Sequence, residues 1–132
     1  MAAFLVACSS LFPAAAASAD YPITPCSLTN AVVTGGFWFA PLETNRLVTI
    51  PSDFRKCEES GRIANFERAG RRERGHFHGI PFDDSDVYKV IEGASYELAA
   101  HPDSALDAYL DALIAKIAAA QEPDGYLYTA RT

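Results

Sequence analysis

Carboxylates gather at the start of one helix-forming stretch, Phe82 to Leu98. Asp84 or Ser85 is expected to be the N-cap, because either side chain can accept a hydrogen bond from the free N–H groups of a first helical turn. Asp86 then falls within that turn, where the positive end of the helix dipole stabilises a carboxylate. Capping and solvation explain these acidic groups. The functional alternative is that the helix start presents carboxylates to a polar ligand, since loops at element ends often carry function.

A pair of histidines is the second pattern with potential chemistry. His76 and His78 flank Phe77, and in a strand they would point to the same side as a metal or sugar contact. No third ligand lies nearby in the sequence, and no Cys-x-x-Cys pair occurs. A zinc site made by this chain alone is therefore not expected, and a structural or exposed histidine pair is favoured.

The composition describes an acidic, globular chain. It has 132 residues, a net charge of −6, 49% hydrophobic residues and 21% charged residues. These values suit one small domain and exclude neither binding nor catalysis. Nucleic acid is not expected as a partner, because phosphate recognition needs a basic face. The one arginine cluster, Arg71, Arg72 and Arg74, is interrupted by Glu73 and is expected to be a solvated loop.

The first 19 residues resemble a targeting segment. Ala2 to Ala17 is apolar and small, and Ala17-Ser18-Ala19 is similar to a signal-peptidase site. Leu5-Val6-Ala7-Cys8 also resembles a lipoprotein signal in which Cys8 would be lipidated, and contact with a membrane is expected only in that case. Both alternatives predict export to the periplasm or the medium. In an exported protein, Cys26 and Cys57 could form a disulfide.

Residues 20–40 predict an extended leader followed by a short strand. Residues 20–31 contain two prolines and no helical period. Val32 to Phe39 is β-branched and aromatic around Gly35-Gly36, which predicts a short strand broken by a turn, with Phe37 and Trp38 as buried anchors. A surface Trp38 that stacks on sugar rings is the alternative.

Residues 41–132 predict helices. Pro41 suits a first turn, Pro51 should end or kink the first helix near Ile50, and Gly61 is a helix stop. Residues 63–69 predict one or two helical turns, and residues 70–79 predict a loop. The two clearest helices have apolar stripes at helical spacing: Val87, Ile91, Ala94 and Leu98, then Leu106, Tyr109, Leu110, Leu113, Ile114 and Ile117.

These two helices are expected to form an antiparallel hairpin. The connection is short, and Asp103 is a plausible N-cap for the second helix. A Pro-Asp-Gly turn at residues 123–125 closes that helix. An amphipathic hairpin needs a surface to pack against, and the preceding helices provide little of it. We therefore expect the front end of a larger helical domain.

Four motifs carry a family resemblance, in this order and spacing. They are Gly36-Phe37-Trp38, Glu58-Glu59-Ser60-Gly61-Arg62, Phe82-Asp83-Asp84-Ser85-Asp86-Val87-Tyr88-Lys89 and Gln121-Glu122-Pro123-Asp124-Gly125-Tyr126-Leu127. Together they resemble the amino-terminal part of glycoside hydrolase family 127, the β-L-arabinofuranosidases, with family 146 closely related. The resemblance begins near Pro22. One departure is Val90, which stands where many relatives have Trp.

The resemblance implies a mainly α fold, the amino-terminal portion of an (α/α)6 barrel, and hydrolysis of plant-type glycans by the full-length enzyme. Relatives use a cysteine thiolate nucleophile held near zinc, with a glutamate acid/base; the metal keeps the thiol deprotonated, and the two steps are those of a retaining glycosidase. None of those motifs occurs here, so no catalytic or metal-binding residue is assigned and the chain alone is expected to be inactive.

A part of the sugar-site rim is the most that this chain is expected to supply. The candidate substrate-binding residues are Arg62, Asn65, Asp84 and Asp86, because carboxylate, amide and guanidinium groups suit sugar hydroxyls. Two alternatives remain open. One is another sugar enzyme on the same barrel, such as a uronyl hydrolase or an epimerase. The other is a non-catalytic glycan-binding surface protein.

Overall fold

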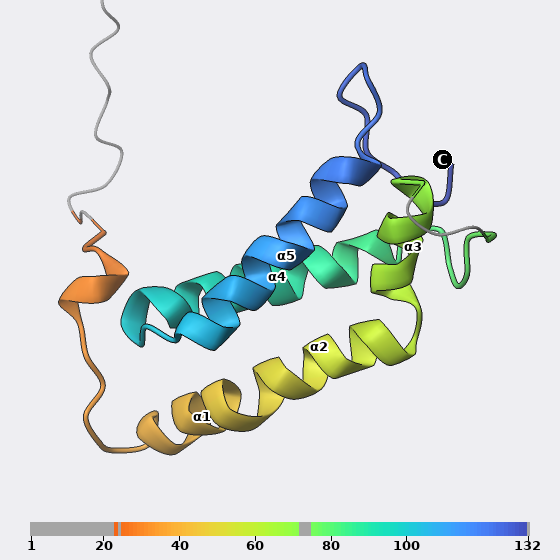
Figure 1. The fold of residues 1–132 in the computed structure, drawn as a ribbon. Coiled ribbons are helices and arrows are strands. Elements are labelled where there is room, and N and C mark those ends of the chain that lie inside the picture. The colour runs from red at the N-terminus through yellow and green to blue at the C-terminus, as the bar shows by residue number, and fades with distance from the viewer. Residues whose placement is uncertain (1–22, 24, 72–74, 132) are drawn as a thin grey trace, which may run out of the picture.

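The computed structural model describes residue 23, residues 25–71 and residues 75–131. The expected signal at residues 1–19, including Cys8, lies outside these residues, as do Arg72 and Arg74. Within them the regular structure is helical (Figure 1), which confirms the predicted mainly α class but not the short β segment expected before the helices. None of the helices in this part of the chain is long and apolar enough to cross a membrane.

The first helical segment passes through Pro51 instead of ending before it. Helix α1 (Phe39–Thr44) continues into a π-helical turn (η2, Asn45–Thr49) and then into α2 (Ile50–Glu59). Proline lacks an N–H and its ring clashes with the carbonyl four residues earlier in an α-helix. The wider π turn precedes Pro51 and lets α2 start afresh, with the proline in its first turn. The expected interruption near Ile50 therefore takes the form of a π turn.

Gly61 separates α2 from α3 (Arg62–Ala69). Its φ of 78° lies in the left-handed region that glycine adopts at low steric cost, which confirms the predicted helix stop. The expected short helix after it is also confirmed. Figure 1 shows that α3 leaves the end of α2 at a steep angle and lies beside the carboxyl-terminal segment.

Helices α4 (Asp84–Ala100) and α5 (Ser104–Ala120) run in opposite directions and cross each other (Figure 1). Asp103 caps α5, because its Oδ1 accepts hydrogen bonds from the N–H groups of Ala105 at 2.9 Å and Leu106 at 3.2 Å. Both the hairpin and this cap agree with the sequence. However, α5 makes more of its contacts with α3 than with α4.

The predicted N-cap of α4 is wrong. The residue before the helix is Asp83, and its side chain makes no capping hydrogen bond. The carboxylates of Asp83 and Asp84 are instead bound by groups from other segments. Two of those partners, Arg62 and Thr129, are distant in the sequence, so the local capping pattern could not reveal them; the third, the Ile80 N–H, lies three residues before Asp83.

A single apolar core joins the helices from α2 to α5. Phe66 and Ile63 of α3 are fully buried in it, next to Val87 of α4. The other members are Ile50, Phe54, Cys57, Ala94, Leu110, Leu113 and Ala120. Of the stripe predicted for α5, Ile114 departs, being 49% exposed.

The expected strand at Val32 to Phe39 does not form. Its residues make bends and a turn that lead directly into α1, and no strand occurs in the described part of the chain. A strand needs a partner for its N–H and C=O groups, and none lies alongside. Gly36, with a φ of 77°, turns the backbone. Phe37 and Trp38 are 79% and 65% exposed, so they are not the buried anchors predicted, and their rings pack on each other at 5.0 Å.

The carboxyl-terminal segment begins with the predicted Pro-Asp-Gly turn. Glu122 donates its N–H to the carbonyl of Tyr126 at 2.8 Å, and the Asp124 side chain accepts from the Tyr126 N–H at 2.9 Å. Gly125 has a φ of 90° within this turn. Leu127 then packs against the core, which returns the chain to the side of α3 (Figure 1).

Candidate functional site

The four predicted substrate-binding residues lie in three separate places. Arg62 and Asp86 form an ion pair beside a groove between α2 and α4. Asn65 lines a second pocket at the end of α3. Asp84 is buried and lines neither. The fold therefore brings two of them together and keeps the other two apart.

Arg62 connects the start of α3 to the start of α4. Its Nε donates to Asp86 Oδ2 at 3.0 Å, and its Nη2 donates to Asp83 Oδ1 at 3.3 Å. The other oxygen of Asp83 accepts the Ile80 N–H at 3.0 Å. Asp83 is thus a buried carboxylate held by a guanidinium and by the backbone of the loop before α4, the kind of partnership that a buried charge requires.

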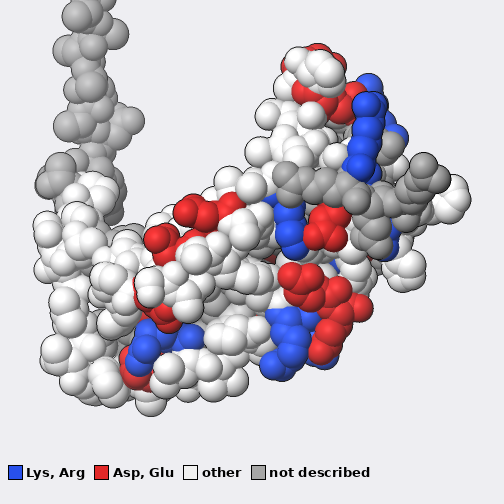
Figure 2. All heavy atoms as spheres, viewed as in Figure 1, with Lys and Arg blue, Asp and Glu red and all other residues white. Residues whose placement is uncertain are grey.

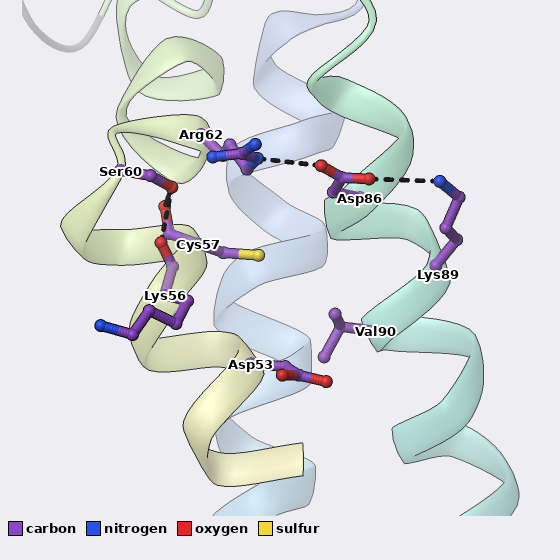
Figure 3. A pocket seen from close by; sticks show the side chains of 8 residues that line it. All are labelled: Asp53, Lys56, Cys57, Ser60, Arg62, Asp86, Lys89 and Val90. Carbon is purple, nitrogen blue, oxygen red and sulfur yellow. Dashed lines mark hydrogen bonds and ion pairs between the residues drawn. The ribbon is translucent and has the colours of Figure 1, made fainter. Parts of the chain in front are cut away.

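The groove next to this ion pair has a volume of about 470 Å³ and is open to solvent. Figure 3 shows the Cys57 thiol pointing from α2 toward α4, with Val90 on the opposite wall. Charged and hydroxyl groups surround this apolar centre: Asp53, Lys56, Ser60, Arg62, Asp86 and Lys89. Val90 therefore borders the groove directly.

Charge neutralisation dominates the electrostatics of the groove. Lys89 donates to Asp86 Oδ1 at 3.1 Å, and this ammonium group, followed by the Arg62 guanidinium, holds the pKa of Asp86 below its ordinary value. Burial raises the pKa of the Cys57 thiol, although Arg62 opposes the shift. The thiol is therefore protonated at neutral pH, which makes it a poor nucleophile.

Pairing of opposite charges also characterises the surface. In Figure 2, acidic and basic side chains lie next to one another on the visible face. Among the described residues, Arg46 pairs with Glu43 and Lys56 pairs with Glu59, each with a nitrogen–oxygen distance of 2.6 Å. Figure 2 thus shows no extended basic patch on this face, and the expectation that nucleic acid is not a partner stays a prediction.

Asn65 fixes the loop that precedes α4. Its Nδ2 donates to the carbonyl of His78 at 2.8 Å, and its Oδ1 accepts the His78 N–H at 3.0 Å. Arg68 Nη1 donates to the same Oδ1 at 3.0 Å. The side chain is only 1% exposed. Its amide binds the N–H and C=O groups of His78, as a neighbouring strand would do in a sheet. Asn65 therefore forms part of the lining of the second pocket, which has a volume of about 380 Å³.

Asp84 joins the start of α4 to the carboxyl-terminal segment. Its Oδ2 accepts the Thr129 N–H at 2.8 Å, and its Oδ1 accepts from the Thr129 hydroxyl at 2.5 Å. Both residues are buried. Because Thr129, Ala130 and Arg131 form one wall of the second pocket, Asp84 positions that wall without touching the cavity.

A metal or nucleophile site does not assemble among the described residues. No group of three His, Cys, Asp or Glu residues in this part of the chain could hold a metal ion. His76 and His78 are exposed and lie in no strand. The residues described here therefore do not fit the zinc site that the family resemblance implies. Cys26 is exposed and Cys57 is buried, both as free thiols, so the possible disulfide does not form.

A family model covers most of the chain. Residues 30–132 match the model described as "Beta-L-arabinofuranosidase, GH127 catalytic domain". This chain belongs to the GH127 family. The helices described above are consistent with the amino-terminal part of its (α/α)6 barrel.

Individual relatives agree with this assignment. The chain is 48% identical over 71 residues to the non-reducing end β-L-arabinofuranosidase of Bifidobacterium longum subsp. longum, covering 54% of this chain and 11% of that protein. It is similar to a solved GH127 β-arabinofuranosidase, with 52% identity and a TM-score of 0.77 over 84% of this chain and 18% of that one. A GH127 β-L-arabinofuranosidase from Geobacillus stearothermophilus T6 gives 34% identity and a TM-score of 0.72, covering 74% and 16%. The chain thus spans less than a fifth of the length of these GH127 relatives.

Three structurally important residues were not predicted from the sequence. Asp83 and Thr129 are buried polar groups whose partners lie 21 and 45 residues away in the chain. Arg68 lines the second pocket beside Asn65. Of the three, only Asp83 could have been noticed in the sequence, because it is the first member of the aspartate pair before the helix. Nothing in the local sequence distinguishes Thr129.

Replacement of Asp84 tests the connection to Thr129. In Asp84→Asn, one acceptor oxygen becomes an NH2 group, which leaves a buried Thr129 donor without a partner. We expect a loss of about 1–3 kcal/mol in the free energy of unfolding, measured by urea denaturation. Asp111→Asn, at an exposed position of α5, is the control and should change stability by less than about 0.5 kcal/mol. Equal stability of the two variants would contradict the role of Asp84.

Thiol labelling tests the state of Cys57. In a Cys8→Ser background at pH 7, N-ethylmaleimide should modify exposed Cys26 rapidly, whereas Cys57 should react only after urea unfolding, because it is buried and its pKa is raised. Mass spectrometry of the digested peptides measures each site. Equally fast labelling of Cys57, or an intact link between the two cysteines, would show the described environment to be wrong.

Proposed function

We propose that this chain forms the first helices of the catalytic barrel of a retaining glycoside hydrolase that acts on β-L-arabinofuranosides in plant-type glycans. The match of residues 30–132 to the GH127 catalytic domain carries the proposal. It is supported by the 52% identity to a solved GH127 β-arabinofuranosidase over 84% of this chain. The activity belongs to the longer enzyme, because the aligned region is only 18% of that relative.

The residues of this chain would then serve as scaffold and as part of the sugar-site rim. The cysteine nucleophile, the glutamate acid/base and the zinc ligands are proposed to lie elsewhere in the full-length enzyme, so the chain alone would be inactive. Among the rim candidates, Asn65 lines the second pocket, although both ends of its amide are already bound to His78 and Arg68. Arg62 and Asp86 border the groove, whereas both oxygens of Asp84 are already bound to Thr129.

The activity is tested by expressing two proteins: residues 1–132, and the complete genomic reading frame that contains them. We expect the longer product to hydrolyse 4-nitrophenyl β-L-arabinofuranoside and the 132-residue chain to release no nitrophenol. The α-L-arabinofuranoside anomer is the control substrate. Hydrolysis of only the α anomer by the longer product would overturn the proposal, as would a frame that ends after Thr132.

Export is proposed on the basis of the amino-terminal sequence. The apolar run from Ala2 to Ala17 and the Ala17-Ser18-Ala19 site support cleavage before Asp20 and delivery to the periplasm or the medium. Mass spectrometry of the mature protein from its native host measures the cleavage point. A start at Asp20 is the expected result, a lipidated Cys8 would indicate a membrane-anchored form, and a retained Met1 would contradict export.

A further inference from the structure

Three segments far apart in the sequence converge on the pocket at the end of α3. Helix α3 supplies its carboxyl-terminal half, the loop before α4 supplies residues 75–77, and the carboxyl-terminal segment supplies residues 129–131. Figure 1 shows α3, this loop and the end of the chain gathered on one side of the molecule. The cavity of about 380 Å³ is lined by Asn65, Arg68, Ala69, Gly75, His76, Phe77, Thr129, Ala130 and Arg131.

The described lining is rich in hydrogen-bond donors and contains no carboxylate side chain. Arg68 of α3 and Arg131 of the carboxyl-terminal segment are both lining residues that carry guanidinium groups, and His76 adds an imidazole. The bond from Arg68 to Asn65 uses one of its five N–H donors. Arg131 lies over the ring of Tyr126 at 4.6 Å and is 3.5 Å from a Glu122 oxygen. Guanidinium groups that share a cavity favour an anionic ligand, and their planar geometry matches a carboxylate.

The same cavity has features that suit a sugar ring. Phe77 is half-buried in the lining and offers an apolar surface, while His76 supplies a polar group for hydroxyls. Both walls are held in place before any ligand arrives, one by the Asn65 contacts to His78 and the other by the Asp84 contacts to Thr129. Such preorganisation reduces the entropy lost on binding.

We propose that this pocket binds the carboxylate of an acidic sugar unit, with Arg68 and Arg131 as the specificity-determining residues. The inference rests on the proposed glycosidase function and refines it: the glycan that carries the hydrolysed unit would contain a uronic acid next to it. The carboxylate lies between the two guanidinium groups, and the sugar ring lies toward Phe77.

Binding is measured by NMR titration of the ¹⁵N-labelled chain at pH 7 and constant ionic strength. The two main probes, D-galacturonate and D-galactose, differ only in the group at C6. We expect galacturonate to bind at least about tenfold more tightly, because charge-assisted hydrogen bonds are about twice as strong as neutral ones. Shifts of the Ala130 and His76 amide signals should report this binding. Acetate and inorganic phosphate test whether a bare anion suffices.

Substitutions locate the carboxylate. Arg68→Gln and Arg131→Gln should each reduce galacturonate affinity to about the level of galactose. Arg131 is exposed, so its replacement leaves the core intact. Arg55→Gln is the matched control, since Arg55 is an exposed arginine that lines neither pocket, and it should bind galacturonate normally.

Four results would overturn the inference: equal affinity for galacturonate and galactose, binding of acetate or phosphate as tight as that of galacturonate, an equal loss in Arg55→Gln, or no binding at all. Each of these leaves the hydrolysis of β-L-arabinofuranosides unaffected. The longer enzyme could instead fail to hydrolyse those substrates while this chain still binds galacturonate more tightly than galactose. That result would contradict the proposed function but support the proposed binding pocket.

Discussion

The hydrogen bonds of the buried Asp84 carboxylate are the interaction on which the position of the carboxyl-terminal segment depends. It receives both hydrogen bonds of Thr129, one from the backbone and one from the hydroxyl. A carboxylate removed from water is unfavourable unless such donors replace the lost solvent. The start of α4 and the carboxyl-terminal segment are therefore held together, and the pocket at the end of α3 exists because this wall stays in place.

The neighbouring aspartates extend this network in other directions. Asp83 binds the Ile80 backbone and Arg62, and Asp86 binds Arg62 and Lys89. One short acidic stretch thus holds the loop before α4 and the start of α3. The apolar core beneath it, centred on Phe66, fixes the helices themselves. For a GH127 chain, this division suits a scaffold: apolar packing sets the helices, and buried polar contacts set the loops that surround the proposed sugar site.

Features that depend only on neighbouring residues were predicted correctly from the sequence. The cap at Asp103, the stop at Gly61 and the turn at Pro123-Asp124-Gly125 depend on neighbouring residues, and the structure confirms each of them. Features that need a partner elsewhere in the chain were not predicted correctly. Val32 to Phe39 has strand-forming residues but no adjacent strand, and Cys26 and Cys57 suit a disulfide only by number. The sugar-binding role of the four site candidates stays a prediction; the structure pairs Arg62 with Asp86, and it shows Asn65 and Asp84 binding backbone groups that no spacing rule indicates.

The sequence by itself determined the helical class, the positions of the two longest helices and the family, because periodicity, caps and ordered motifs are properties of contiguous residues. Tertiary structure alone decided which carboxylate meets which donor, how α5 comes to pack on α3, and which side chains share a cavity. The physical reason is the range of the interactions. A cap or a turn is complete within a few residues, whereas Asp84 and Thr129 must be brought together across 45 residues by the packing of everything between them.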